Sequence, residues 1–231
     1  MNNYIIWNGK DSRDISGLII CELPPITKPK IRTKITTIDG RDGSIVDYLG
    51  YESYTKEIQI GIKSTNDTDK IIKFFTGKGE VIFSNEPDKY YKAEIVRDVD
   101  YERLLRYKTA SITFYVQPFK YKVREPKFTL NITNETSYMV TNQGLEKSKP
   151  VITLYGSGDV TFTLNGIDVF TITIDDDYVT VDAEEQEAYK EGTLKNRKMG
   201  GDFPLLKPGI NTITWSGNLT KIVVDPKSRW L

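Results

Sequence analysis

Hydrophobic and polar positions alternate along much of the chain, which predicts a protein built mainly of β-strands. In the N-terminal half the alternation is clearest over Ile58–Ile62 and over Ile112–Val116. A period of two is typical of a strand that buries one face and exposes the other.

One short helix is predicted in this half, over Asn66–Thr76. Its apolar positions recur at helical spacing, and Thr65 or Asn66 can cap its first N–H groups. Gly77 follows it and suits the left-handed turn that ends many helices. Because Val81–Ser84 then reads as a strand, we expect a β-sandwich-like N-terminal domain with one short helix packed on its sheet.

The C-terminal half carries short apolar runs separated by turn residues. Asn165-Gly166 between two β-rich runs is the strongest short hairpin signal, and Gly156-Ser157-Gly158 and Ser216-Gly217 also read as turns. Many short strands separated in this way predict a β-sandwich. The expected strands are Val151–Tyr155, Val160–Leu164, Val169–Ile174, Tyr178–Asp182, Ile210–Trp215 and Lys221–Val224.

A change of pattern near residue 120 predicts a domain boundary. Pro118 and Pro126 accompany a charged stretch, and residues 120–127 read as an exposed link. We therefore place an N-terminal domain at residues 1–124 and a C-terminal domain at residues 125–231.

A polar break, Gly40-Arg41-Asp42-Gly43, separates the β-rich runs Ile31–Ile38 and Ser44–Leu49. Two glycines so close together suit a tight turn or loop. Spacing alone predicts the tip of a hairpin here.

Net charge narrows the classes of function. Lys+Arg and Asp+Glu both number 32, so the formal net charge is zero. Nucleic-acid affinity rests mainly on cations that face phosphates, so a nucleic-acid-binding role is not expected. A neutral chain repels its own copies weakly, which permits self-assembly.

The first residues show no signal-peptide pattern, and no run approaches the roughly 20 apolar residues of a membrane span. We therefore expect synthesis in a cytoplasm and no membrane partner. The single cysteine, Cys21, cannot form an intrachain disulfide. It lies in an apolar run, Leu18–Cys21, where a buried small hydrophobe is favoured over a nucleophile.

Histidine is absent, which removes the commonest general base and the commonest metal ligand. The remaining candidates for chemistry are the carboxylates of Asp175–Asp177 and of the acidic residues that follow them. Acidic residues between two strands are usually solvated, an interpretation that we favour over a calcium site or a glycosidase pair. We expect no enzymatic activity, no cofactor and no bound metal.

Several aromatic residues can stack on sugars if they are exposed. Aromatic residues in this number belong mainly to cores and interfaces, which is the interpretation that we prefer. The candidates are Tyr51, Tyr54, Tyr90, Tyr91, Trp215 and Trp230.

In the order of its short motifs the chain resembles the distal tail proteins of long-tailed phages that infect Gram-positive bacteria. The opening Trp7–Ser12, the turn Gly40–Gly43 and the segment Gln117–Tyr121 are similar to that family's N-terminal domain. Gly156–Asp159 and Met199–Asn211 follow in the order of its C-terminal domain. Each piece is unspecific alone, and their order over nearly the whole chain carries the resemblance.

The resemblance implies an N-terminal belt domain that assembles into a hexameric ring, and a C-terminal galectin-like β-sandwich. It implies a place at the tip of the virion tail, with the major tail (tube) protein and the tail-associated fibre or tail-tip protein as partners. In some phages of this kind the ring also carries receptor-binding proteins. We expect Gly40, Arg41, Asp42 and Gly43 to lie close to the ring contact or to the lumen. Because DNA passes through a tail, we expect lumen-facing side chains to be neutral or acidic.

Two other functions stay open from the sequence. One is a carbohydrate-binding module that attaches the phage to the host cell wall through the second domain. The other is a glycoside hydrolase built on the acidic run. A galectin-like shape does not decide between them, because a fold does not establish sugar binding.

Overall fold

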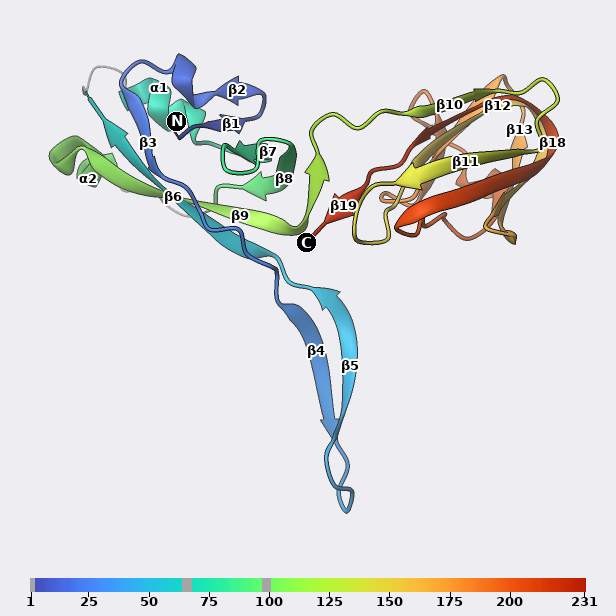
Figure 1. The fold of residues 1–231 in the computed structure, drawn as a ribbon, viewed down its shortest axis with the longest axis horizontal. Coiled ribbons are helices and arrows are strands. Elements are labelled where there is room, and N and C mark those ends of the chain that lie inside the picture. The colour runs from blue at the N-terminus through green and yellow to red at the C-terminus, as the bar shows by residue number, and fades with distance from the viewer. Residues whose placement is uncertain (1–2, 64–67, 97–100) are drawn as a thin grey trace. The chain divides into compact units, whose positions relative to one another are not determined.

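The computed structural model describes residues 3–63, 68–96 and 101–231. The chain is mainly β and divides into two compact units, Met1–Val123 with Leu231, and Arg124–Trp230 (Figure 1). The division falls one residue before the boundary placed from the sequence. Among the described helices, none is long and apolar enough to cross a membrane.

The N-terminal unit contains most of its strands in one antiparallel sheet. Its order is β2-β1-β7-β8-β9-β6-β3, and β4 and β5 form a separate two-stranded sheet. The elements are β1 (Ile5–Trp7), β2 (Lys10–Asp11), the 3-10 helix η1 (Ser12–Asp14), β3 (Leu18–Glu22), β4 (Ile31–Thr37), β5 (Ser44–Tyr51), β6 (Tyr54–Ile62), α1 (Thr68–Phe74), β7 (Lys78–Phe83), β8 (Lys89–Glu94), α2 (Tyr101–Tyr107) and β9 (Thr109–Lys122).

The core of this unit forms around the alternating positions expected from the sequence. Ile58, Ile60 and Ile62 of β6 are buried, as are Ile112, Phe114 and Val116 of β9. The Phe114 ring is at the centre, with ring centroids of Trp7 at 5.3 Å and Phe83 at 5.7 Å. Each fully buried side chain of this size contributes roughly 1.5–3 kcal/mol.

The predicted helix is confirmed in a shorter form as α1, and Ile71 and Phe74 join the core. The proposed caps, Thr65 and Asn66, lie outside the described residues. Gly77 has φ +87° after the helix, a left-handed conformation that glycine adopts without strain.

A second helix, α2, corrects the expectation of a single one. Leu104 is fully buried, but its neighbour Leu105 is 44% exposed. This narrow apolar stripe gives a weak periodic signal. The informative features are Glu102 in the first turn and Arg106 in the last, which suit the helix dipole.

The expected exposed link at residues 120–127 is wrong in its first part. β9 continues to Lys122, and Lys120 is only 6% exposed. Pro118 lies inside β9 where the pairing with β8 is irregular, between Tyr91 and Ala93. A bulge is one of the few places where a strand accepts proline.

Cys21 was expected to be buried, and it is exposed. The pairing of β3 with β6 shifts register between Ile20 and Glu22, so Cys21 occupies the irregular position. Because Ile20 is buried, the two-residue period of β3 turns Cys21 to the exposed face.

The C-terminal unit is also antiparallel. It contains β10 (Phe128–Asn131), β11 (Ser137–Asn142), β12 (Val151–Leu164), β13 (Ile167–Ile174), β14 (Tyr178–Asp182), β15 (Glu187–Lys190), β16 (Thr193–Leu194), the 3-10 helix η2 (Asn196–Lys198), β17 (Met199–Gly201), β18 (Gly209–Asp225) and β19 (Arg229–Trp230).

Two long strands, β12 and β18, pair with each other through both layers of this unit. The first half of β12 pairs with β14 and its second half pairs with β13. The second half of β18 pairs with β10 and its first half pairs with β11. The result is a two-layered β-structure around a core that includes the stacked rings of Phe162 and Phe170.

Two expected turns are therefore corrected to bends inside long strands. Gly156 pairs with Leu219 and Ser157 with Asn218, where the register of β12 and β18 shifts. A Cβ on Gly156 would lie 2.1 Å from the Asn218 carbonyl oxygen. Glycine here allows close backbone approach at a corner between layers.

The Asn165-Gly166 hairpin is confirmed between β12 and β13. Both residues have positive φ, +52° and +79°, as a two-residue type I′ turn requires.

Candidate assembly surface

The hairpin of β4 and β5, with the loop that joins them, is here called the arm (residues 31–51). Every residue from Ile31 to Gly50 is exposed. The strands pair from Thr33↔Tyr48 to Thr37↔Ser44. A lone two-stranded hairpin is at best marginally stable in water.

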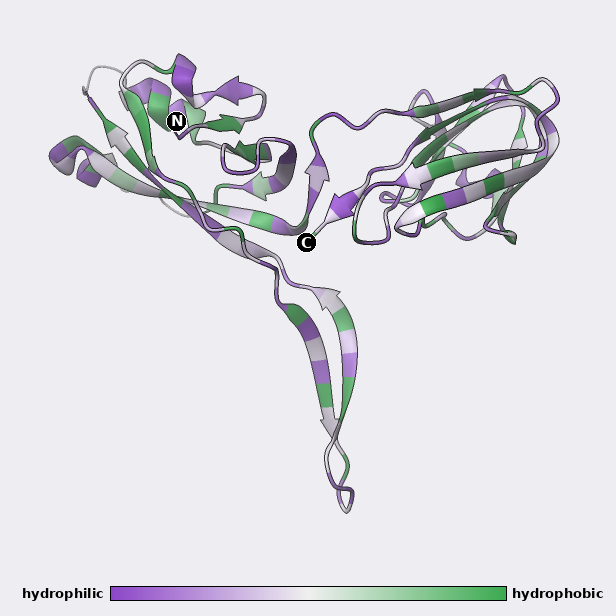
Figure 2. Ribbon diagram, in the orientation of Figure 1, coloured by the Kyte–Doolittle hydropathy of each residue, from purple (hydrophilic) through white to green (hydrophobic). Residues whose placement is uncertain are grey.

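One face of the arm, here called the apolar face, carries Ile35, Val46 and Tyr48 together with Thr33, Thr37 and Ser44. Residues directly opposite in an antiparallel pair point to the same side. Ile35 faces Val46, and Thr33 faces Tyr48. Ile35, Val46 and Tyr48 are 65%, 43% and 75% exposed. Figure 2 shows hydrophobic and hydrophilic bands alternating along both strands.

The other face is more polar. It presents the pair Lys34 and Asp47 beside the pair Thr36 and Ile45. The two faces therefore differ in character although both lie open. An exposed apolar sheet face of this kind marks an interaction surface.

The structure brings Gly40, Arg41, Asp42 and Gly43 together at the tip of the arm, which confirms the predicted hairpin tip. Gly40 and Gly43 have φ +79° and +81°. The Arg41 N–H donates to the Ile38 carbonyl at 3.1 Å and closes the first turn of the loop. The expected position of this tip near a ring contact or a lumen stays a prediction.

The base of the arm is tied by backbone and side-chain hydrogen bonds. The Glu52 N–H donates to the Lys30 carbonyl at 2.8 Å. The Arg32 guanidinium donates to the Leu49 carbonyl at 3.0 Å, across the irregular part of the hairpin.

Beside the arm's base, the N-terminal unit buries a polar cluster of Lys56, Lys120, Glu86 and Tyr91. Glu86 accepts from the Lys120 ammonium at 2.6 Å and from the Tyr91 hydroxyl at 3.0 Å. The Lys56 ammonium donates to the Pro25 carbonyl at 2.9 Å. Burial lowers the pKa of Lys56 to about 8 against the favourable charge of Glu86. Burial is also the main cause that raises the pKa of Tyr91.

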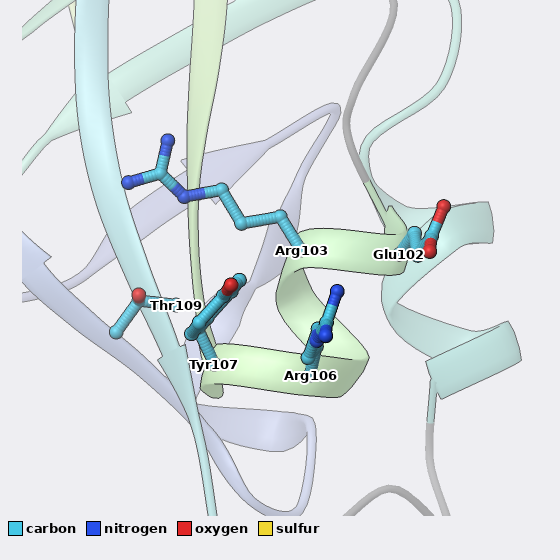
Figure 3. A pocket seen from close by; sticks show the side chains of 5 residues that line it. All are labelled: Glu102, Arg103, Arg106, Tyr107 and Thr109. Atoms are coloured by element: carbon cyan, nitrogen blue, oxygen red, sulfur yellow. The ribbon is translucent and has the colours of Figure 1, made fainter.

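A cavity of about 630 Å³ lies beside α2. Figure 3 shows its lining side chains around the helix. Arg103 and Arg106 outnumber Glu102, and Tyr107 and Thr109 complete the lining. The Arg106 guanidinium lies 5.7 Å from the centroid of the Tyr107 ring. The site can attract anions, but its side chains are exposed.

The acidic run Asp175–Asp177 joins β13 to β14. Lys190 contacts Asp176 at 2.8 Å, and Lys198 pairs with Asp175. The hydrogen bond from Lys190 holds the pKa of Asp176 below its usual value. Among the described residues, no group of three or more candidate ligands could hold a metal ion. The run is a surface of ion pairs.

A second cavity, of about 670 Å³, lies in the C-terminal unit. Ile167, Phe203 and Leu205 line it together with the charged residues Asp168 and Asp202. Part of its polar lining is already engaged, because Asp168 accepts from the Thr163 hydroxyl at 2.6 Å.

Most of the aromatic residues considered for sugar stacking pack against protein. Tyr91 is 1% exposed, and Tyr90 stacks on Tyr121 with 5.5 Å between ring centroids. Tyr54 packs on the N-terminal core and Trp215 on the C-terminal core. Tyr51 and Phe119 make an edge contact at 5.6 Å.

The chain is similar in fold to solved structures. It aligns over 100% of its length with 100% of the Dit protein of phage SPP1, a hub of the adsorption apparatus of phages that infect Gram-positive bacteria. The TM-score is 0.71 and the sequence identity 17%.

The chain has the distal tail protein fold. A chain of the phage p2 baseplate in its activated conformation is also similar, with a TM-score of 0.50, 11% identity and 97% of each chain covered. No protein-family model and no curated protein matches the sequence. The distal tail protein fold thus persists here at a sequence identity where only the backbone likeness is informative.

Sequence reasoning identified the tip of the arm but missed the arm's apolar face and the buried polar cluster. The runs Ile31–Ile38 and Ser44–Leu49 contain the apolar residues, yet periodicity does not tell a face on a core from a bare one. The cluster joins residues far apart in sequence, such as Lys120 and Glu86, so local pattern does not show which of them contact one another.

Proposed function

We propose that this protein is a structural component of a bacteriophage tail tip, where copies of the chain form a ring through the arm. The likeness of fold to the SPP1 Dit hub protein over both whole chains supports the place in the tail. The observation that carries the ring is the arm, in which exposure runs unbroken from Ile31 to Gly50.

The arm favours contact with a copy of the chain for an energetic reason. Ile35, Val46 and Tyr48 leave apolar surface in water on a hairpin that is marginal alone. Burial of apolar surface in a contact stabilises that contact by roughly 25 cal/mol per Å². An arm that packs on a different surface of the next copy makes a head-to-tail contact, which closes into a ring when the rotation permits.

Six copies are the number that the distal tail protein resemblance implies. The ring would join the major tail (tube) protein to the tail-associated fibre or tail-tip protein, and could carry receptor-binding proteins. The protein would then act by contact and not as an enzyme, and it would reside in the virion after synthesis in the host cytoplasm.

The tip of the arm fits a position near the passage for DNA. Its loop carries Asp39, Arg41 and Asp42, with one more acidic than basic group. A wall of this charge repels phosphate weakly and does not retain it.

A pair of adjacent substitutions tests the arm. Ile35→Lys places a charge on the apolar face, whereas Thr36→Lys places the same charge on the polar face. We expect Ile35→Lys to raise the concentration at the midpoint of self-assembly at least tenfold, and Thr36→Lys to change it little, as measured by sedimentation.

The double replacement of Arg41 and Asp42 by Ala extends this test to the tip. Weaker self-assembly, or failure to join purified tail tubes, is the expected result. Equal effects of Ile35→Lys and Thr36→Lys would contradict a contact through the apolar face.

Carbohydrate binding is the alternative function, and the cavity lined by Phe203 is where it can be tested. Saturable binding of cell-wall glycans, lost on Phe203→Ala and kept on Ile35→Lys, would favour the alternative.

A further inference from the structure

A short strap, residues 23–30, leads from β3 to the arm. It contains Pro24, Pro25 and Pro29, which lack the N–H that a sheet ladder needs. Pro24 and Pro29 are buried. Such a segment must be held by its carbonyl groups and by packing.

Among the residues that the structure describes, three side chains donate hydrogen bonds to these carbonyls. The Asn85 amide donates to Pro24 at 2.9 Å, and the Lys56 ammonium donates to Pro25 at 2.9 Å. The Tyr54 hydroxyl donates to Thr27 at 3.3 Å. Lys56 and Tyr54 both belong to β6, so the sheet itself holds the strap.

Lys56 is the strongest of these donors because it is charged and only 3% exposed. Its ammonium lies 5.0 Å from the centroid of the Tyr91 ring and 5.5 Å from that of Tyr54. Glu86 balances part of the charge while it binds Lys120 directly at 2.6 Å.

Burial of an ammonium is costly, and an apolar side chain of similar size is often as stabilising. A methionine in place of Lys56 would therefore give nearly the same stability. Its specific contribution is the bond to the Pro25 carbonyl.

We propose that Lys56 is a positioning residue whose buried ammonium holds the strap, and with it the base of the arm, in the geometry that self-assembly requires. The inference rests on the proposed role of the arm in assembly. Loss of a charge-assisted hydrogen bond shifts a local equilibrium by about tenfold, so an unheld strap would release the arm about ten times more often.

The test measures the arm and the assembly separately. Nitroxide labels on Cys21 and on a cysteine introduced by Lys34→Cys report the distance between β3 and the polar face of the arm. Labelled chains are diluted with unlabelled ones, and electron–electron double resonance gives the distribution of distances. Sedimentation of the unlabelled chain gives the midpoint of assembly.

Lys56→Met is the variant, and Lys120→Met is its matched control, because Lys120 binds Glu86 but makes none of the three strap contacts. We expect Lys56→Met to broaden the distances and to raise the assembly midpoint about tenfold, and Lys120→Met to keep the narrow distribution. If Lys56→Met fails to fold, Asn85→Ala releases the Pro24 carbonyl without altering a buried charge, and a smaller broadening is expected.

A narrow distribution in both Lys56→Met and Asn85→Ala would overturn the inference. The inference would also be overturned if Lys56→Met broadened the distribution of distances but assembled as well as the original chain, while Ile35→Lys did not assemble. If Ile35→Lys also assembles normally, the proposed function fails, and a broadened arm in Lys56→Met would still show that Lys56 anchors the strap.

Discussion

Lys56 and Lys120 are both buried in the N-terminal unit, and Glu86 is the carboxylate between them. Such a cluster is costly, so it needs a local reason, and the strap carbonyls provide one. Lys56 is in phase with Ile58 and Ile60, so the alternation along β6 places it on the buried face. Its partners, the Pro25 carbonyl and Glu86, are distant along the chain, so the sequence does not show why a lysine stands there.

The pKa of Lys56 determines the direction in which this group changes the free energy of unfolding with pH. The pKa is about 8 in the folded chain and 10.5 as an ordinary lysine, so between these values the unfolded chain binds more protons. The free energy of unfolding from this group therefore rises with pH above 8, by about 1–3 kcal/mol in total.

We expect Lys56→Met to remove this rise. The free energy of unfolding of the original chain, relative to that of the variant, should therefore increase between pH 7.5 and 9.5. Urea unfolding at several pH values measures it. The upper limit keeps the ionisation of Tyr54 and Tyr91 out of the range, since both have a raised pKa. A difference that is independent of pH would contradict the buried charge.

At the scale of elements, glycines showed where the backbone takes an unusual conformation, but not whether that place is a turn or a bend inside a strand. Asn165-Gly166 is a hairpin, as predicted, because a two-residue loop leaves no other geometry. Gly156 and Gly217 looked equally like turns, yet they are corners inside β12 and β18. Local sequence marks a backbone that glycine alone tolerates, and only the long-range pairing shows whether the chain reverses there.

The corner predicts a contrast between two glycines. A Cβ on Gly217 would lie 2.3 Å from the Asp159 carbonyl oxygen, at φ +99°. Gly158 has φ +78° with nothing within 4 Å of a Cβ. We expect Gly217→Ala to lower the free energy of unfolding by more than 3 kcal/mol and Gly158→Ala by about 1 kcal/mol.

Urea unfolding of the full chain, followed in the transition of the C-terminal unit, measures both. Equal small effects would mean that the backbones at the corner are not in close contact.

At the scale of the whole molecule, the two β-rich units and the hairpin tip were predictable from sequence. The pattern of apolar positions predicts the strands. The absence of histidine removes the commonest general base and the commonest metal ligand. The bare face of the arm was not predictable, because Ile35 and Val46 look like core residues in the sequence, whereas both side chains are exposed in the structure.

The central claim is that copies of this chain assemble through the arm. Native mass spectrometry of the purified full chain over a range of concentrations, with negative-stain images of the same samples, tests it most directly. We predict a species of six chains with a central opening, which Ile35→Lys abolishes and Thr36→Lys preserves. A chain that stays monomeric at every concentration and in the presence of tail tubes would contradict it.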